Sequence, residues 1–344
     1  MTGLSSFSPE RILVCQLRQI GDVLLTTPSI RLLHERYPAA AIDVFTEKKC
    51  VPVLENNPHV RRVWALDKKA LPNFLAELRY YARIAAENYD LVVDFQQLPR
   101  CRFVTLMSRA RVRLSYPPPW YNRLLYTHWA TPVHGYSGSY RASILAPLGI
   151  VWNGQGPEMF LTEKEKGWAR DYLAACGLVP GTYVTLDPTH RRSTRLWPAR
   201  HYGAMIDQVH AARPALRFFI LYGPGEEAMV REVLNSCTAT QACILPDTVI
   251  GLRQMAAVQS MARLHVGNCS GPRHFAVAVG CPTLTVLGAT SGGWRFPSEI
   301  HQDIFLDLPC RPCNQNRCAS NDHACLENLP PERVSQRLLA MLGP

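Results

Sequence analysis

The sequence has no uninterrupted apolar run of about 18 residues, the length that a membrane-spanning helix requires. Its first residues also lack the charged stretch followed by an apolar stretch that is typical of a secretory signal. Charged residues make up only 19% of the chain and hydrophobic residues 47%, which excludes a disordered polyelectrolyte. We therefore expect a cytosolic globular protein whose 344 residues form two domains of ordinary size.

Familiar nucleotide-binding motifs are absent as well. Neither half of the chain contains G-x-G-x-x-G, which argues against a dinucleotide-dependent oxidoreductase, and there is no P-loop G-x-x-x-x-G-K-[ST]. No zinc finger and no aromatic–basic RNA motif is present. We therefore expect neither a cofactor nor a nucleic acid partner.

The chain has twelve cysteines, of which eight are scattered through apolar segments, where buried thiols behave as small hydrophobic groups. The other four form a cysteine-rich tail over 310–325, with His323 beside them: Cys310, Cys313, Cys318 and Cys325. Their spacing is compatible with a structural zinc ion or a cluster, but reduced thiols packing a short loop, or local disulfides, would fit equally. In each case we expect the tail to hold a terminal helix over 332–342, and we expect no catalytic metal.

The net charge of +10 is unevenly distributed. Residues 1–155 contain 19 Lys and Arg against 11 Asp and Glu, or +8, whereas residues 156–344 contain 18 against 16, or +2. A dense basic stretch comprises Arg100, Arg102, Arg109, Arg111, Arg113 and Arg123. Such a stretch suits an acidic partner, either a phosphorylated glycan or an anionic membrane surface bound peripherally, but a merely solvated basic face fits as well.

Apolar runs alternate with amphipathic segments along most of the chain, which predicts parallel βαβ units. A Gly- and Pro-rich stretch over 146–163 indicates a linker. The sequence therefore predicts an α/β protein of two doubly wound, Rossmann-like domains, 1–155 and 156–344, that face a central cleft. The predicted strands span 11–17, 41–46, 60–66, 91–95, 183–186, 216–222 and 283–287, and the predicted helices 23–37, 51–56, 71–87, 199–212, 228–235 and 332–342.

Residues 114–142 interrupt this rhythm with three consecutive prolines, two tryptophans and several tyrosines. The segment therefore predicts a loop-rich wall, that is, a surface segment of loops outside the hydrophobic core. Its aromatic rings could stack on sugars or fill a seam between the domains, and the sequence favours neither.

The stretch 266–274, VGNCSGPRH, predicts a strand that turns at once into a helix. Such a turn directs free backbone N–H groups and the positive end of the helix dipole at one point, where phosphates commonly bind. Gly271 allows close approach, Ser270 and His274 offer further donors, and Asn268 and Cys269 complete the turn. A tight turn without a ligand is an equally good interpretation.

A similar turn follows the first predicted strand. Gly21 permits the tight turn, and Asp22 then projects from the carboxyl end of the strand, the edge at which open α/β sheets bind ligands. A general base and a helix cap are equally compatible with Asp22.

The second half adds donors and an acid at other strand ends. Thr189 and Arg195, with two further arginines between them, suit a diphosphate, and Glu226 could accept a hydrogen bond from a ribose hydroxyl. A nucleoside diphosphate on one domain and the carboxylate of Asp22 on the other describe a glycosyl transfer in which the diphosphate leaves.

These motifs resemble those of a known family. The stretch 18–28 (RQIGDVLLTTP), Trp197-Pro198 after a basic residue, and GNCSGPRH followed by GAT resemble the glycosyltransferase family 9 heptosyltransferases of lipopolysaccharide core synthesis, over about residues 10–335. Within the family, the details at 26–28, 57–58, 187–189 and 287–290 are most similar to the heptosyltransferase III type.

The resemblance implies a GT-B fold and inverting, metal-independent transfer from an ADP-heptose donor on the C-terminal domain to a lipopolysaccharide inner-core acceptor on the N-terminal domain. It also implies that Asp22 is the base, that Arg195 binds phosphate and that Glu226 holds the ribose. The protein would act on the cytoplasmic side, in peripheral contact with the inner membrane. Cys269 departs from the family, which usually has Asp there. This departure leaves two alternatives open, another nucleotide sugar as donor or a sugar-nucleotide-binding protein without transferase activity.

Overall fold

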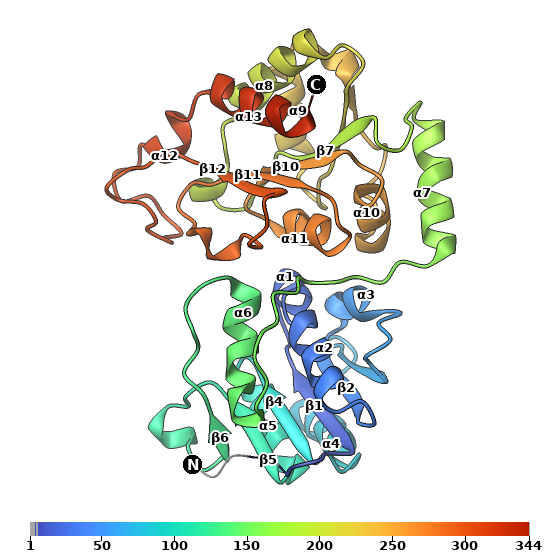
Figure 1. The fold of residues 1–344 in the computed structure, drawn as a ribbon, viewed down its shortest axis with the longest axis vertical. Coiled ribbons are helices and arrows are strands. Elements are labelled where there is room, and N and C mark those ends of the chain that lie inside the picture. Colours follow the sequence, from blue (N-terminus) through green and yellow to red (C-terminus); the bar gives the residue numbers. More distant parts are fainter. Residues whose placement is uncertain (1–3, 5, 344) are drawn as a thin grey trace. The chain divides into compact units, whose positions relative to one another are not determined.

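Two six-stranded parallel sheets, each flanked by helices, make up the computed structural model, which describes Leu4 and residues 6–343 (Figure 1). The chain divides into two units, of which unit 1 ends at Phe160 and unit 2 begins at Leu161. The predicted division after residue 155 lies in the same extended segment, which joins a short 3-10 helix ending at Leu148 to the helix that begins at Glu163.

In unit 1 the strand order is β3-β2-β1-β4-β5-β6, and all neighbours are parallel. Helices α4 and α5 pack side by side, as do α2 and α6. The elements are β1 (Arg11–Cys15), α1 (Ile20–Leu24), α2 (Thr27–Arg36), β2 (Ala41–Glu47), η1 (Lys48–Cys50), α3 (Val51–Leu54), β3 (Arg62–Leu66), α4 (Phe74–Ala85), β4 (Leu91–Asp94), α5 (Pro99–Ser108), β5 (Val112–Ser115), η2 (Trp120–Asn122), β6 (His128–Trp129), α6 (Ser137–Ala142) and η3 (Ser143–Leu148).

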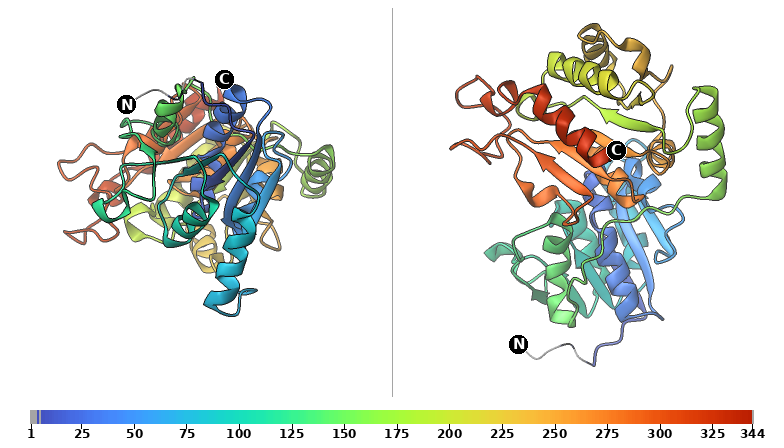
Figure 2. Two further views of the ribbon diagram at one scale, coloured as in Figure 1. Left: turned by 90° about the horizontal axis from the view of Figure 1, so that it is seen from below. Right: turned by 45° about the horizontal axis from the view of Figure 1, so that its top comes forward.

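In unit 2 the order is β12-β11-β10-β7-β8-β9, again all parallel. Helices α8, α9 and α13 lie on one face of the sheet and α10 and α11 on the other (Figure 1), and the further views show α13 beside α8 (Figure 2). The elements are α7 (Glu163–Ala175), β7 (Tyr183–Asp187), η4 (Ser193–Arg195), α8 (Ala199–Ala212), β8 (Arg217–Ile220), α9 (Glu227–Asn235), η5 (Thr240–Ala242), β9 (Cys243–Ile244), α10 (Leu252–Gln259), β10 (Leu264–Asn268), α11 (Gly271–Ala278), β11 (Thr283–Val286), η6 (Gly292–Trp294), β12 (His301–Ile304), α12 (Ala324–Glu327) and α13 (Pro331–Leu342).

Burial explains why the central strands are nearly continuous apolar runs. Every residue of β4, β7 and β10 is buried, because helices cover both faces of a doubly wound sheet. Local signals fix the helix starts around them. Thr162 and Glu165 form a capping box at the start of α7, since each side chain accepts a hydrogen bond from the backbone N–H of the other, over 3.2 and 2.7 Å.

Each sheet has one point at which the strand order reverses. In unit 1 it lies between β1 and β4, and in unit 2 between β7 and β10. Connections from these neighbouring strands leave in opposite directions, so a crevice opens at their carboxyl ends, which is where doubly wound sheets bind ligands. The segments after β1, β7 and β10 are the segments that the sequence singled out.

Two sequence-based assignments need correction. The predicted helix over 23–37 is two helices, α1 and α2, because Pro28 lacks an N–H and is accommodated in the first turn of a new helix. The predicted wall over 114–142 contains β6 and α6, whose sequences are too short and too rich in serine and glycine to predict. Among the described residues, no helix is both long and apolar enough to cross a bilayer.

Candidate active site

Asp22 lies in the first turn of α1, the helix that follows the carboxyl end of β1. One carboxylate oxygen accepts a hydrogen bond from the backbone N–H of Gln19 over 3.0 Å, so the helix-cap interpretation is correct. The side chain is still 25% exposed, which leaves it accessible to a ligand. Capping and chemistry are therefore compatible at this position.

The second oxygen of Asp22 forms an ion pair that the sequence analysis missed. Arg141 Nη2 in α6 donates to Asp22 Oδ1 over 2.5 Å, and Arg141 Nη1 donates to the carbonyl oxygen of Ser137 over 2.9 Å. The arginine side chain is only 10% exposed, so its position is fixed by packing. Nothing in the pattern SGSYRAS marks this arginine, because the two residues are brought together only by the docking of α6 beside α2.

The backbone before α1 is held by the loop that follows β4. Gln96 Oε1 accepts hydrogen bonds from the backbone N–H groups of Leu17 and Arg18, over 2.9 and 3.2 Å. Tyr116 and Tyr140 pack against each other, with ring centroids 5.6 Å apart. Tyr116 also lies near the charges of Arg141 and Asp22. The carboxyl edge of the first sheet thus presents a fixed carboxylate beside aromatic rings and an arginine, which suits a sugar hydroxyl.

In unit 2, two elements form what we call the anion site. Ser270 and Gly271 lie at the start of α11, and Arg195 lies in η4. Ser270 is the N-cap residue, and a Cβ built on Gly271 would meet nothing within 4 Å, so the side of the first turn of α11 at Gly271 is open. Burial lowers the pKa of Arg195, against the opposing effect of the nearby Cys269, and its Nε is buried without a hydrogen-bond partner among the described residues. A half-buried guanidinium and a free helix start favour a bound anion.

A carboxyl network lies beneath the anion site. Asp187, at the end of β7, accepts hydrogen bonds from the hydroxyls of Ser270 and Thr189, the latter over 3.1 Å. The same Thr189 hydroxyl lies 2.6 Å from Glu226 Oε2, so its single proton is shared between the two carboxyl groups. Burial raises the pKa of Asp187 to about 7. The negative charge of Glu226 also raises this pKa, whereas the hydrogen bonds from Ser270 and Thr189 lower it.

Glu226 caps the loop that follows β8, at the start of α9. Its Oε2 accepts from Thr189 and from the backbone N–H of Gly223, over 2.6 and 2.8 Å. Both bonds use the same oxygen, so Oε1 is the atom that a ribose hydroxyl could reach. The structure brings Thr189 and Glu226 together, and their role toward a nucleotide stays a prediction.

Asn268 is fully buried and its side chain holds the β7–α8 loop. Its Oδ1 accepts from the backbone N–H of Trp197 over 3.0 Å, and its Nδ2 donates to the carbonyl oxygen of Thr189 over 3.3 Å. Both polar atoms are thereby occupied. Asn268 therefore acts in this structure as a positioning residue that carries Thr189 and Arg195 to the anion site.

Cys269 points into the unit, with only 6% of the residue exposed. Arg273 Nη1 lies 3.5 Å from its sulfur, and Arg273 Nη2 donates to Asp303 Oδ1 over 2.8 Å. This buried Arg273–Asp303 pair is a second feature that the sequence analysis missed. His274, one position further on, is 7% exposed and its ring centroid lies 6.0 Å from that of Trp294.

The cysteine-rich tail braces the loops of this site. Arg311 Nε donates to the carbonyl oxygen of Gly288 over 2.6 Å, and Thr194 donates to the carbonyl oxygen of Gln315 over 2.9 Å. The backbone N–H of Asn314 donates to the carbonyl oxygen of Ala289 over 2.9 Å. These bonds go to the loops after β7 and β11, whereas Cys325 packs against the apolar core that includes Val334 and Leu338 of α13, so the expected hold on the terminal helix stays a prediction.

The thiols of the tail form no metal site in this structure. Within Leu4 and residues 6–343, no three His, Cys, Asp or Glu side chains are grouped so as to hold a metal ion, and all twelve cysteines are free. Cys318 lies 3.4 Å from the hydroxyl of Ser320, and Cys325 packs against the core of unit 2. Reduced thiols packing a loop are compatible with these contacts, and the choice among the three interpretations stays a prediction.

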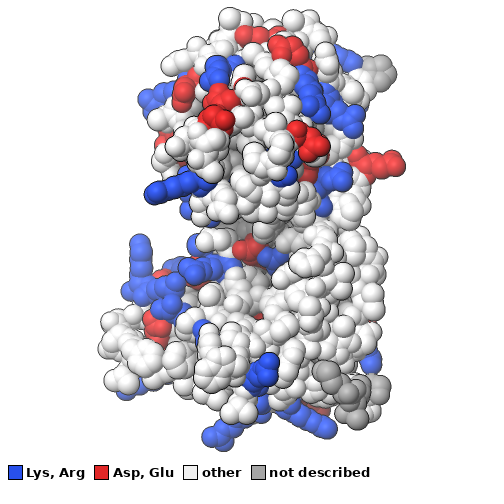
Figure 3. All heavy atoms as spheres, turned by 90° about the vertical axis from the view of Figure 1, so that its left-hand side faces the viewer, with Lys and Arg blue, Asp and Glu red and all other residues white. Residues whose placement is uncertain are grey.

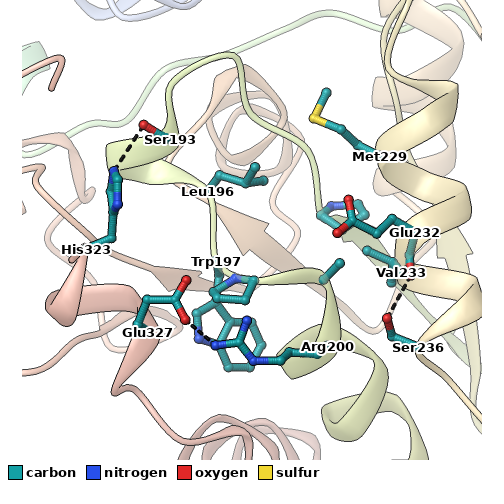
Figure 4. A pocket seen from close by; sticks show the side chains of 13 residues that line it. Ser193, Leu196, Trp197, Arg200, Met229, Glu232, Val233, Ser236, His323 and Glu327 are labelled. Carbon is teal, nitrogen blue, oxygen red and sulfur yellow. Dashed lines mark hydrogen bonds and ion pairs between the residues drawn. The ribbon is translucent and has the colours of Figure 1, made fainter. Parts of the chain in front are cut away.

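A cavity of about 340 Å³ lies on the tail side of the β7–α8 loop (Figure 4). His323 is directed at Ser193, with Nε2 and Oγ 3.1 Å apart, and Arg200 is directed at Glu327, with which it forms an ion pair. No residue of the anion site lines this cavity. Its walls join the tail to the loop that carries Arg195, so we assign it a bracing role.

The basic stretch of unit 1 is only partly a surface. Arg100 pairs with Glu77, and Arg113 donates to backbone carbonyl oxygens, whereas Arg109, Arg111 and Arg123 are exposed. On the face of unit 1 drawn in Figure 3, Lys and Arg predominate over Asp and Glu.

Comparison with known proteins places these features in a family context. A family model described as "Glycosyltransferase family 9 (heptosyltransferase)" matches residues 78–323. Lipopolysaccharide heptosyltransferase 3 of Escherichia coli is 28% identical over 288 residues, which cover 80% of this chain and 82% of that protein.

Solved structures share the fold. A glycosyl transferase family 9 structure from Veillonella parvula superposes with a TM-score of 0.84 at 19% identity and covers 97% of both chains. The E. coli ADP-heptose lps heptosyltransferase II superposes with a TM-score of 0.76 at 19% identity and covers 96% of this chain and 98% of that one. The α/β fold of GT-B type expected from the sequence is thereby confirmed.

Proposed function

Because the chain belongs to glycosyltransferase family 9, we propose that it transfers a heptose from ADP-heptose to the inner core of lipopolysaccharide. The observation that carries the donor side is the anion site, where the buried Nε of Arg195 has no hydrogen-bond partner among the described residues and the first turn of α11 is open at Gly271. A nucleoside diphosphate is the natural ligand of such a site. The curated relative named above is itself a lipopolysaccharide heptosyltransferase.

The reaction follows from the chemistry of the two edges. An acceptor hydroxyl oxygen attacks the anomeric carbon of the heptose, the bond from that carbon to the β-phosphate oxygen breaks, and ADP leaves with the bonding electrons, which inverts the anomeric centre. Asp22 takes the hydroxyl proton, a role worth roughly 10²–10⁴ in rate. Arg195 and the N–H groups of Ser270 and Gly271 stabilise the negative charge that develops on the diphosphate.

Arg141 fixes the base. A carboxylate on a short helix could adopt several rotamers, but the hydrogen bonds from Gln19 and Arg141 hold both of its oxygens. These two hydrogen bonds fix the orientation of the Asp22 carboxylate and thereby of its remaining lone pairs. The acceptor hydroxyl therefore meets a base that is already oriented. The nucleotide is bound by other residues, since Thr189 and Glu226 contact each other within unit 2.

A transfer assay tests the proposal. Purified protein is incubated with ADP-heptose and a lipopolysaccharide acceptor truncated in its inner core, in the presence and absence of a chelator, and ADP release and acceptor mass are followed. We expect one heptose to be added per acceptor at the same rate with and without chelator. ADP-heptose that is bound but neither hydrolysed nor transferred would instead identify a sugar-nucleotide-binding protein.

A second donor is worth testing because of Cys269. Family members usually have a carboxylate at this position, whereas the thiol here is a weak hydrogen-bonding group that faces the buried Arg273. A panel of ADP- and UDP-sugars, offered with the same acceptor, measures donor choice directly. Higher kcat/KM for another nucleotide sugar than for ADP-heptose would change the donor and leave the reaction class intact.

A further inference from the structure

A chain of hydrogen bonds connects the two ends of the proposed nucleotide site in unit 2. It starts at Ser270, the N-cap residue of α11, whose hydroxyl donates to Asp187 Oδ2. The hydroxyl of Thr189 lies 3.1 Å from Asp187 Oδ1 and 2.6 Å from Glu226 Oε2. The backbone N–H of Gly223 ends the chain by donating to the same Glu226 oxygen over 2.8 Å. The turn proposed for the diphosphate and the acid proposed for the ribose are thus joined through Asp187.

The chain lacks one proton when both acids are ionised. Two carboxylates then flank the hydroxyl of Thr189, which has a single proton to donate. Its shorter contact is to Glu226, so the Thr189 proton lies on that side. Among the described residues, the other donor to Asp187 Oδ1 is the backbone N–H of Thr189, at a long 3.4 Å. A proton on Asp187 Oδ1 completes the chain, because Asp187 then donates to Thr189 and Thr189 donates to Glu226.

Burial places this proton on Asp187 rather than on Glu226. Only 2% of Asp187 is exposed, and burial raises its pKa to about 7, with a further contribution from the charge of Glu226. Glu226 is partly exposed, and its Oε2 accepts from a backbone N–H as well as from the hydroxyl. The negative charge of the pair therefore resides on Glu226.

Three titratable groups on the surrounding elements stay neutral around pH 7. In the loop after β7, burial and the charge of Arg195 lower the pKa of His190 to about 4. In β10, burial lowers the pKa of His265 to about 3, and in α8 burial raises the pKa of Tyr202 well above its ordinary value. The other charged or titratable groups on these elements and on β12 are Arg192, Arg195, Cys269, Arg273, His274 and Asp303. The arginines remain charged, so the thiol and the His274 imidazole are the alternatives that the variants below separate from Asp187.

We propose that Asp187 takes up a proton from solvent when a nucleoside diphosphate binds at the anion site, so that the entering negative charge meets a neutral acid. The inference rests on the proposed function, since it takes the diphosphate to lie at the start of α11. An ionised Asp187 would repel the diphosphate from a distance of one hydrogen bond, through Ser270. Asp187 is accordingly a positioning residue that selects the protonation state in which the donor binds.

Titration calorimetry of the full chain with ADP-heptose, in the absence of acceptor, measures the linked proton. The diphosphate of ADP-heptose is esterified at both ends and keeps its charge near neutral pH, whereas the terminal phosphate of ADP titrates at about pH 6. Repeating each titration in buffers of different ionisation enthalpy gives the number of protons taken up. We expect almost none at pH 6, where Asp187 already holds its proton, and almost one at pH 8. Affinity should be full below pH 7 and about tenfold lower at pH 8.

Asp187→Asn is the first variant, because an amide imitates the protonated acid: its oxygen accepts from Ser270 and its nitrogen donates to Thr189. We expect an affinity close to that of the wild type at pH 6, no proton uptake, and no change of affinity between pH 6 and pH 8. Asp171→Asn, an exposed acid-to-amide change in α7, is the matched control and should behave like the wild type.

Glu226→Gln tests the same pair without changing Asp187, and it decides the matter if circular dichroism shows that Asp187→Asn does not fold. Removing the charge of Glu226 should lower the pKa of Asp187, so the midpoint of the pH dependence of affinity should move to lower pH. Affinity should also fall by the same factor at every pH, because the ribose contact is lost. A purely structural role of the two acids would change affinity or stability and leave the midpoint where it is.

Two results would overturn the inference: a wild-type affinity that is equal at pH 6 and pH 8, or proton uptake that persists in Asp187→Asn. The second would assign the proton to Cys269 or His274. Nucleotide binding without a linked proton contradicts this inference and leaves the proposed function in place. Absence of nucleotide binding at every pH contradicts both, whereas proton-linked binding without transfer to any acceptor counts against the proposed function alone.

Discussion

Arg141 and Asp22, which are 119 positions apart in the chain, form a hydrogen-bonded ion pair of 2.5 Å at the carboxyl edge of the first sheet. The arginine side chain is almost buried and donates a hydrogen bond to the carbonyl oxygen of Ser137 in its own helix. Because its position is set by these contacts, Arg141 holds the Asp22 carboxylate in place. This pair gives the first prediction.

Arg141→Ala should lower kcat for transfer while the affinity for ADP is unchanged. Losing a charged hydrogen bond costs about 1.5–3 kcal/mol, and the freed Asp22 should sample unproductive rotamers. Arg141→Lys should restore part of the rate, because an ammonium keeps the charge but not the bidentate fork. Equal losses of kcat in the Lys and Ala variants, with reduced thermal stability in both, would point to a structural role alone.

Asp22→Asn should reduce turnover by roughly 10²–10⁴ because the amide cannot accept the acceptor's proton. ADP affinity, measured by calorimetry, should stay at the wild-type value, since the anion site belongs to unit 2. Glu10→Gln, an exposed carboxylate-to-amide change in the same unit, serves as the control. Turnover like that of the wild type would exclude Asp22 as the base.

Arg195→Ala should weaken ADP binding by roughly ten- to a hundredfold, which corresponds to the loss of one charged hydrogen-bond partner. Arg200→Ala is the matched control, because Arg200, in the first turn of α8, lines the cavity and pairs with Glu327. We expect its ADP affinity to be unchanged. If the two variants bind ADP equally well, the diphosphate does not lie at the start of α11.

Gly271→Ala and Gly267→Ala should separate binding from folding. A Cβ at Gly271 meets nothing within 4 Å, so we expect normal stability, and we expect weaker ADP binding because the methyl group would hinder close approach of the diphosphate to the backbone of the first turn of α11. A Cβ at Gly267 would lie 2.4 Å from the carbonyl oxygen of Asp187, and backbone cannot move aside cheaply. Urea unfolding should show a loss of about 1–3 kcal/mol for Gly267→Ala only.

Asp187 should make stability depend on pH. Its pKa is raised to about 7 in the folded protein from an ordinary value of 3.8, so the native state binds the proton more tightly than the unfolded state. The stabilisation is full below about pH 3.8 and is lost as the pH rises through 7, with a slope of at most about 1.4 kcal/mol per pH unit. Relative to Asp187→Asn, the unfolding free energy of the wild type should therefore fall between pH 5 and pH 8. A constant difference between the two proteins would refute the raised pKa.

The alternation of apolar runs and amphipathic segments was enough to predict two parallel α/β sheets, because a doubly wound sheet buries both faces of every central strand. The turns GD after β1 and GNCSG at the end of β10 could also be predicted, since a tight passage from strand to helix requires specific residues within a few positions. These local signals placed Asp22, Ser270 and Gly271 at the switch points. They also left two interpretations open for Asp22, and the structure shows that its capping role is real.

Tertiary structure alone decided which distant groups meet. Arg141 reaches Asp22 through the docking of α6, the tail reaches Thr194 from Gln315, and Arg273 pairs with Asp303 inside unit 2. No local pattern encodes such contacts, because an arginine in a short serine-rich helix has the same propensities whether it faces solvent or a carboxylate. Only close packing of elements far apart in the chain, and the cost of leaving a buried charge unpaired, selects the partner.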